Sequence, residues 1–154
     1  AAVHDLLSKS EVGGSIINLK LLIKEIIDIY INREKPQISI HLDDIFIPYN
    51  KATTIGLIIN ELINNCVKHA FENFNDALIK VNCEELKNHI SIKIEDNGKG
   101  ISGDFYSGNT NKLGLPLVNS IVKNEFHGTL NISRNEGTTV NIFIPKGVLS
   151  ISND

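Results

Sequence analysis

A chain of 154 residues is long enough to form one domain with a sizeable core, and its composition, 42% hydrophobic and 21% charged, is that of an ordinary globular protein. A net charge of −3 excludes a general affinity for nucleic acid or for anionic membranes. No apolar run reaches the ~20 residues that span a bilayer, and no secretory signal opens the chain.

The first half of the chain predicts two helices with a strand between them. Residues 16–31 place apolar side chains at steps of three and four, which is typical of an amphipathic helix. Residues 37–42 alternate like a strand after Pro36, and a long helix follows Pro48 over roughly 51–71. The apolar face of the first helix consists of Leu19, Leu22, Ile23, Ile26, Ile27 and Tyr30.

The second half predicts four strands and one helix. Three strands alternate with consistent parity, and residues 137–145 predict a last strand. The alternating residues are Ala77, Ile79, Val81 and Cys83 in the first strand, Ile90, Ile92 and Ile94 in the second, and Leu130 and Ile132 in the third. The helix has the apolar residues Leu117, Val118, Ile121, Val122 and Phe126, with Gly128 as its C′ residue.

This order of elements favours one domain of the α/β (α+β) class, a two-layer sandwich with helices on one face of a mixed, mostly antiparallel sheet. Residues 101–112 are polar, dotted with glycine and without periodicity, so we expect a mobile loop there. The cysteines, Cys66 and Cys83, fall in apolar runs without a CxxC partner, so we expect buried thiols rather than a metal or redox site.

The most informative stretch is ISIKIEDNGKGI, residues 90–101. Asp96 shares the parity of the isoleucines before it, so its carboxylate should point toward the core, where it needs hydrogen-bond donors. Gly98 and Gly100 let a ligand approach the backbone closely. This arrangement suits a flat ligand with an amino group, such as adenine. The alternative is a DNG hairpin turn, but the turn is followed by a loop rather than a strand.

A second candidate lies on the helix predicted over 51–71. On a 3.6-residue period Glu61, Asn65, Lys68 and His69 share one stripe, opposite the apolar stripe of Ile55, Ile59, Leu62, Ile63, Cys66 and Ala70. Asn65 could bind Mg²⁺ through its amide oxygen, Lys68 could contact phosphate, and Glu61 could accept a proton. A solvated helix face with Glu61 paired to Asn65 or Lys68 is the alternative, and this pattern alone favours it.

Two further segments are weaker candidates. KLGLPLV, residues 112–118, brings Gly114 to the start of a helix, where free N–H groups could bind phosphate; an ordinary loop-to-helix joint is the alternative. Thr138 has the inward parity of the last strand, so its hydroxyl needs a partner. That partner is either Asp96, directly or through water, or a neighbouring backbone group.

Taken in this order, the segments resemble the GHKL ATP-binding superfamily, and most closely the catalytic domain of sensor histidine kinases. The resemblance covers roughly residues 37–145. NELINNCVKHAF is similar to the N box of that family, and EDNGKGI, KLGLPLV and GTTV are similar to its three glycine boxes. The NEL…KHAF form and the preceding VHDLL resemble a subgroup with a distinct dimerization region. The resemblance implies a Bergerat-type fold with ATP and Mg²⁺ under a flexible lid.

The resemblance also implies a role for each matching residue. Asn65 matches the Mg²⁺-binding asparagine, and we prefer it to Asn64 because it lies four residues from both Glu61 and His69. Glu61 matches the acidic residue that assists phosphoryl transfer, and Asp96 matches the aspartate that contacts adenine. Residues 101–112 match the lid. The remaining ATP-binding positions implied are Lys68, His69, Gly98, Gly100, Ile101, Leu113, Gly114, Leu115 and Thr138.

The chain has no methionine, even at position 1, so we expect an excised part of a longer protein. By the resemblance, residues 1–12 are a remnant of the dimerization and phosphoacceptor domain, and 13–154 are the ATP-binding catalytic domain. His4 lies after the position of the phosphoacceptor histidine in that subgroup, so we expect that histidine outside this chain. The implied partners are the dimerization domain of the same homodimeric kinase and a response regulator, and no nucleic acid is implied. The implied location is the cytoplasm, with or without a membrane anchor in the parent protein.

Three other functions compete with a histidine kinase. A GHKL ATPase of the gyrase or chaperone kind would need a transducer domain after the sheet. A serine kinase that acts as an anti-sigma factor shares the N box but not the VHDLL segment. A non-catalytic nucleotide-binding module would not require both Glu61 and Asn65.

Overall fold

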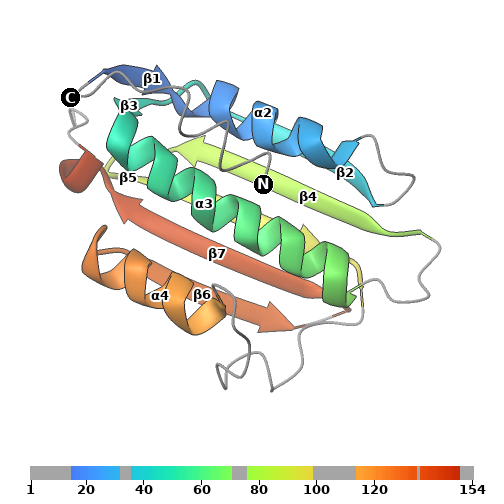
Figure 1. Ribbon diagram of the computed structural model, residues 1–154. Coiled ribbons are helices and arrows are strands. Elements are labelled where there is room, and N and C mark those ends of the chain that lie inside the picture. Colours follow the sequence, from blue (N-terminus) through green and yellow to red (C-terminus); the bar gives the residue numbers. More distant parts are fainter. Residues whose placement is uncertain (1–14, 32–35, 71–75, 99–113, 135, 150–154) are drawn as a thin grey trace.

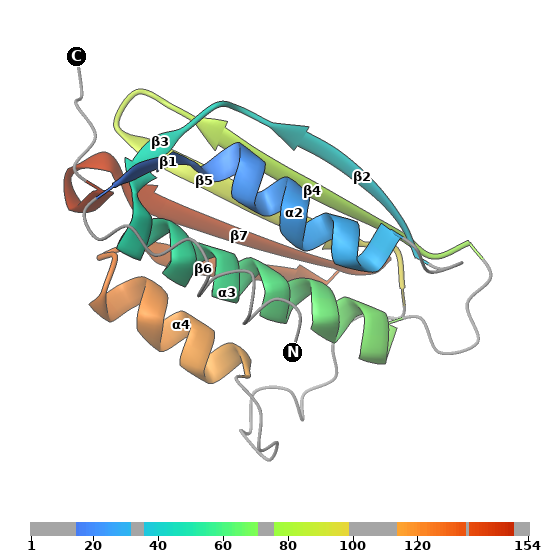
Figure 2. The ribbon, with the colours of Figure 1, turned by 45° about the horizontal axis from the view of Figure 1, so that its top comes forward.

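The computed structural model describes residues 15–31, 36–70, 76–98, 114–134 and 136–149. They form two layers, a sheet and a layer of helices on one of its faces (Figures 1 and 2). The helices are α2 (Leu19–Ile31), α3 (Tyr49–Asn65), which continues into a π-helix, η1 (Cys66–Ala70), and α4 (Leu115–Asn124). A short 3₁₀ helix, η3 (Lys146–Leu149), follows the last strand. The predicted two-layer fold is confirmed.

The sheet has five strands in the order β2-β4-β5-β7-β6. The bounds are Gln37–Leu42 for β2, Leu78–Glu85 for β4, His89–Asp96 for β5, Thr138–Pro145 for β7 and Thr129–Arg134 for β6. Only β2 and β4 pair in parallel, and the other neighbours are antiparallel. The mixed, mostly antiparallel sheet is therefore confirmed.

The core lies between the sheet and the helices, as the periodicities predicted. Every residue of the predicted apolar face of α2 is buried. The inward residues of β4, β5 and β7 are buried as well, and they alternate with partly exposed residues on the helix-free face. Period-two alternation thus identified one face of each central strand, and that face meets the helices.

The predicted helix over 16–31 is wrong at its start. Residues Ile16–Asn18 form a strand, β1, which pairs with β3 (Phe46–Pro48) in a separate two-stranded sheet. The helix begins at Leu19 because Asn18 caps it: Oδ1 of Asn18 accepts hydrogen bonds from the amides of Lys20 (3.1 Å) and Ile45 (3.2 Å).

Two details predicted for α4 are also wrong. Leu117 is 49% exposed, and Leu115 takes its place in the core. The residue with left-handed backbone after the helix is His127, with φ 51°, rather than Gly128. Gly128 is required for space instead, because a Cβ there would overlap the carbonyl oxygen of Phe143.

Among the described residues, no helix is both long and apolar enough to cross a membrane. Residues 1–12, predicted as a remnant of another domain, and 101–112, predicted as the lid, lie outside the described residues.

Candidate functional site

The buried carboxylate of Asp96 is the centre of the candidate site. Asp96 ends β5 and is only 7% exposed, so the inward parity predicted for it is confirmed. Its Oδ1 accepts a hydrogen bond from the amide of Gly98 (2.9 Å), and its Oδ2 accepts one from the thiol of Cys66 (3.3 Å). A buried carboxylate is costly unless it is hydrogen-bonded, and these two donors come from a turn and from the helix layer.

Cys66 is the functional neighbour that sequence reasoning missed, since it was assigned only to the apolar core. It is buried, as expected, and it is the first residue of the π-helix η1. Burial raises the pKa of the Cys66 thiol well above its ordinary value, and the charge of Asp96 and the hydrogen bond to it raise the pKa further. The thiol is therefore protonated and acts as a donor. One signal could have identified it: Cys66 is the only residue of the predicted apolar stripe whose side chain can donate.

Asn65 is the last residue of α3 and is 8% exposed. This burial rules out the alternative of a solvated helix face at this position. Within the described residues, Nδ2 of Asn65 has no hydrogen-bond partner. Such an atom is rare in a folded protein and needs an explanation, which a bound ligand would supply. A half-turn about χ2 would present Oδ1 in the same direction.

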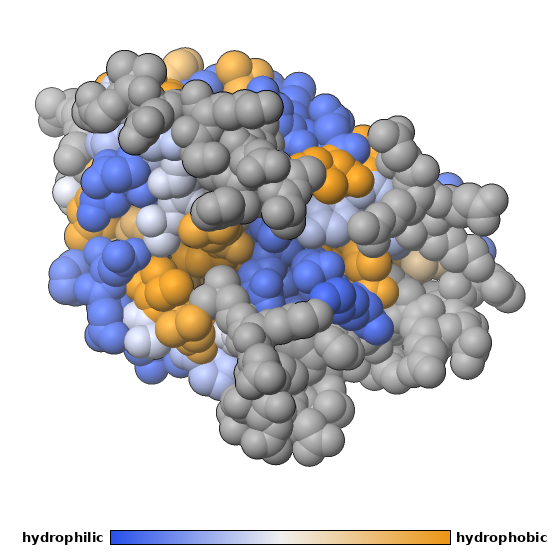
Figure 3. Space-filling model, in the orientation of Figure 1, coloured by the Kyte–Doolittle hydropathy of each residue, from blue (hydrophilic) through white to orange (hydrophobic). Residues whose placement is uncertain are grey.

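The other residues of the predicted stripe do not all share one environment. Glu61, one turn before Asn65, is partly buried, whereas Lys68 is exposed. The 3.6-residue period used for the prediction ends at Asn65, because η1 has the wider turn of a π-helix. The side chain of His69 lies outside the described residues. Figure 3 shows hydrophilic residues gathered over the C-terminal half of α3, the part that carries Glu61.

The start of β7 forms the third side of the site. Thr138 is 3% exposed, as predicted, and it is the register partner of Asp96 across the β5–β7 pair. The C-terminal end of α3 lies over the point where β5 ends and β7 begins (Figure 1). The fold therefore brings Asn65, Cys66, Asp96 and Thr138 to one end of the sheet. The partner of the Thr138 hydroxyl stays a prediction.

Asn97 holds the end of β5 against β4, a function that the sequence did not indicate. Its Oδ1 accepts a hydrogen bond from the amide of Leu78, and its Nδ2 donates one to the carbonyl of Asp76, both at 2.8 Å. This side chain therefore fixes the backbone on which Asp96 and Gly98 lie.

The backbone of Gly137 lies close against the carbonyl of Asp96. Its φ is +124°, and a Cβ there would overlap the carbonyl oxygen of Asp96. We expect Gly137→Ala to lower the free energy of unfolding by roughly 1–3 kcal/mol, because both the backbone strain and the overlap displace the end of β5. Thermal denaturation would measure this loss.

Gly147→Ala is the matched control, since a Cβ at Gly147 would meet nothing within 4 Å. Its melting temperature should stay close to that of the unmodified chain. Equal melting temperatures for the two variants would show that the approach at Gly137 is not tight.

The helix start predicted at Gly114 is confirmed. Gly114 is the extended N-cap of α4, with no hydrogen bond from a side chain to cap the helix. The side chain of Leu115 lies in the core, so any contact it makes with a ligand would use its main chain. Three predicted nucleotide contacts, Gly100, Ile101 and Leu113, lie outside the described residues.

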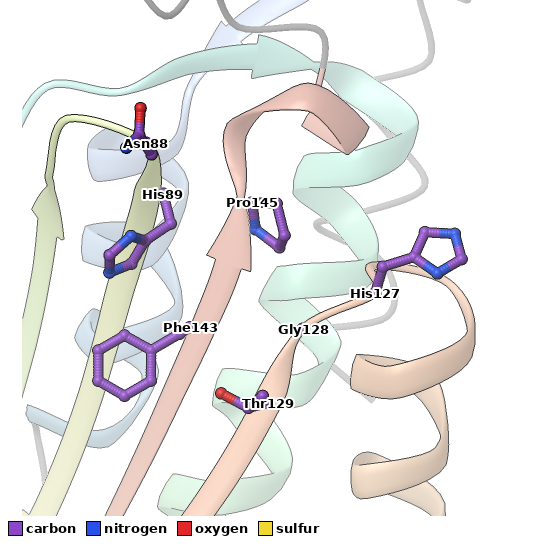
Figure 4. Close-up of a pocket in the computed structure, with 7 residues that line it drawn as sticks. All are labelled: Asn88, His89, His127, Gly128, Thr129, Phe143 and Pro145. Carbon is purple, nitrogen blue, oxygen red and sulfur yellow. The ribbon is translucent and has the colours of Figure 1, made fainter.

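A separate cavity of about 410 Å³ lies at the other end of the sheet, on the helix-free face (Figure 4). His89 and Phe143 line one side of this cavity, and their rings pack edge to face with centroids 5.4 Å apart. His127 lines the opposite side of the cavity. None of the predicted site residues lines this cavity. The buried polar groups at Asp96 therefore mark the better candidate.

Comparisons with known proteins identify the family to which the chain belongs. The family model described as histidine kinase-, DNA gyrase B- and HSP90-like ATPase matches residues 50–148, a range that includes Asn65, Cys66, Asp96 and Thr138. The chain is similar to the sensor histidine kinase PdtaS of Mycobacterium tuberculosis, with 27% identity over 154 residues, 96% of this chain and 30% of that protein. The chain thus spans less than a third of the length of this relative.

Solved structures show the same fold. The histidine kinase domain of a blue-light-activated histidine kinase from Erythrobacter litoralis matches with a TM-score of 0.74 and 23% identity, over 96% of this chain and 73% of that one. The histidine kinase ThkA, solved in complex with the response regulator TrrA, matches with a TM-score of 0.70 and 20% identity, over 97% of this chain and 47% of that one.

Proposed function

Because this chain belongs to the family of histidine kinase-, DNA gyrase B- and HSP90-like ATPases, we propose that it is the ATP-binding catalytic domain of a sensor histidine kinase. The observation that carries the proposal is the buried carboxylate of Asp96, which is oriented by two donors, one of them Cys66, the residue that follows the buried Asn65. The catalytic domain would comprise residues 13–154.

Asp96 would recognise the adenine base of ATP. An ionised carboxylate offers about four acceptor sites, and Gly98 and Cys66 occupy one on each oxygen. The remaining sites can accept from the 6-amino group of adenine. Guanine carries a carbonyl oxygen at that position, which the carboxylate would repel. The site should therefore select ATP over GTP.

Asn65 would bind the magnesium ion that accompanies ATP. Amide oxygens are suitable Mg²⁺ ligands, and Mg²⁺ in such sites usually keeps phosphate oxygens and waters as its other ligands. The unpartnered atom is the nitrogen Nδ2, so Asn65 would take this role after a half-turn about χ2 that brings Oδ1 to the same side. When bound, the ion neutralises charge on the phosphates. Lys68, which is exposed beyond Asn65, and His69 would contact the phosphate side of the nucleotide.

The reaction would be transfer of the γ-phosphoryl group to a histidine on the dimerization domain. An N–P bond forms to the imidazole, and the bond from the γ-phosphorus to the bridging oxygen breaks, leaving ADP. Glu61 would accept the proton that the imidazole loses. Such a transfer depends on positioning and charge neutralisation more than on covalent help from the protein.

The proposed partners follow from the same family resemblance. They are the dimerization domain of the same kinase, within a homodimeric parent protein, and a response regulator that receives the phosphoryl group. ThkA, which shares this fold, is a kinase solved with a response regulator. We place the domain in the cytoplasm, where ATP and response regulators are found.

A phosphotransfer assay tests the proposal. The chain, mixed with the dimerization domain of its kinase and ATP labelled on the γ-phosphate, should give acid-labile label on a histidine of that domain. Glu61→Gln should slow transfer by roughly 10²–10⁴-fold, the usual contribution of a general base, while leaving ATP affinity nearly unchanged.

Glu25→Gln is the matched control, because Glu25 is exposed on α2. Acid-resistant label would instead support a serine kinase of the anti-sigma-factor type. ATP binding without any transfer would support a non-catalytic module, and an unchanged rate for Glu61→Gln would remove Glu61 from the mechanism.

A further inference from the structure

We propose that Cys66 is a positioning residue for nucleobase recognition, in that its thiol holds the carboxylate of Asp96 in the orientation that selects adenine. This inference rests on the proposed function, because it concerns the same pocket. It adds a specificity-determining role for a side chain that the sequence pattern assigned to the apolar core.

The geometry around Asp96 carries the inference. The two oxygens of the carboxylate have different donors: the amide of Gly98 contacts Oδ1 at 2.9 Å, and the thiol of Cys66 contacts Oδ2 at 3.3 Å. One donor alone would leave the carboxylate able to rotate about χ2. A second donor on the other oxygen fixes that rotation, and with it the direction of the remaining acceptor sites.

The two donors also belong to different layers of the fold. Gly98 lies in the turn that follows β5, whereas Cys66 begins the π-helix η1 after α3. Cys66 and Asp96 are 30 residues apart in the sequence, and their contact is buried. The thiol therefore links the helix layer to the end of β5. A shift of the helix would turn the carboxylate, and a bound base would in turn restrain the helix.

The thiol of Cys66 is one of two donors that the described residues place on the Asp96 carboxylate. Within the described part of the chain, Oδ1 of Asp96 accepts from Gly98 and Oδ2 accepts from Cys66. Removal of the thiol would leave Oδ2 buried without that donor, and an acceptor in this state loses the free energy of its lost hydrogen bond. The carboxylate would then rotate toward water, away from the position of the base.

The chain offers a matched control in its other cysteine. Cys83 is also buried, but it lies on β4 with Ile92 as its register partner, rather than against a carboxylate of the site. Removing either thiol deletes the same buried atom. Only the removal of Cys66 also deletes a hydrogen bond to Asp96, so a comparison of the two separates positioning from packing.

The first experiment measures nucleotide affinity by calorimetry on the chain with Mg²⁺, using ATP, ADP and GTP. Cys66→Ala should weaken ATP and ADP binding about tenfold, the usual effect of losing one hydrogen bond to a charged group, and should reduce the preference for ATP over GTP. Cys66→Ser, which keeps a donor, should recover most of the affinity. Cys83→Ala should lower the melting temperature but bind both nucleotides normally.

The second experiment does not require a Cys66 variant that folds. The chain has only two cysteines, so Cys83→Ala leaves the S–H stretching band of Cys66 as its single thiol band in the infrared spectrum. A hydrogen bond to the carboxylate should place this band below the frequency of a free thiol, and Asp96→Asn should raise it. A purely structural thiol would give a band that Asp96→Asn does not move.

The outcomes distinguish this inference from the proposed function. Failure of the unmodified chain to bind ATP would contradict the proposed function. Normal ATP binding combined with unchanged affinity and selectivity in Cys66→Ala would overturn only the role of Cys66. Equal losses of affinity in Cys66→Ala and Cys83→Ala, or an S–H band that does not respond to Asp96→Asn, would also overturn it.

Discussion

Asp96→Asn should weaken the binding of ATP and ADP by roughly 30- to 900-fold and remove the preference for adenine over guanine. The amide of asparagine can still accept from Gly98 through one atom, but it presents an NH₂ group where Oδ2 was. That group then faces either the thiol of Cys66 or the amino group of the base, so a donor opposes a donor. Losing a charged acceptor and leaving a buried donor unpaired together cost about 2–4 kcal/mol. Calorimetric titration with ATP, ADP and GTP would measure this effect.

Asp28→Asn provides the control for this substitution, because Asp28 is exposed on α2, far along the sequence from the site. It should bind nucleotide as the unmodified chain does. Two results would contradict the assignment of Asp96 to adenine: equal affinities of the unmodified chain for ATP and GTP, or normal ATP binding by Asp96→Asn.

Asn65→Ala should abolish the dependence of nucleotide binding on magnesium. The side chain of Asn65 is buried beside Cys66, and its Nδ2 has no partner in the described residues, so a half-turn about χ2 can direct Oδ1 to that unfilled position, where a metal would bind. We expect the increase in ATP affinity that Mg²⁺ gives the unmodified chain to disappear, and the rate of phosphoryl transfer to fall about 100-fold or more. Titrations with Mg²⁺ and with a chelator would measure the first effect.

Asn64→Ala is the matched control, since it deletes the same group one residue earlier, where the side chain is only partly buried. It should retain the magnesium dependence. If both substitutions behave alike, or if Asn64→Ala has the larger effect, the metal ligand is not Asn65 and the helix presents a different face to the nucleotide.

The sequence by itself determined the five strands of the main sheet and the inward direction of Asp96. Side chains alternate strictly along a strand, so a run of isoleucines at every second position identifies the buried face and carries Asp96 with it. The same reasoning identified Thr138 at the start of β7 and the apolar face of α2. These predictions depend only on periodicity within one element, which neighbouring residues are enough to specify.

The tertiary structure decided which groups meet Asp96. The α-helical period predicted correctly that Cys66 is buried, but it did not show that the thiol contacts Asp96 or that Asn65, on the polar stripe, is buried as well. The thiol contact, the approach of Gly137 and the register of Asp96 with Thr138 join segments far apart in the chain. No local period encodes such contacts, because they depend on where packing of the two layers places the end of each element.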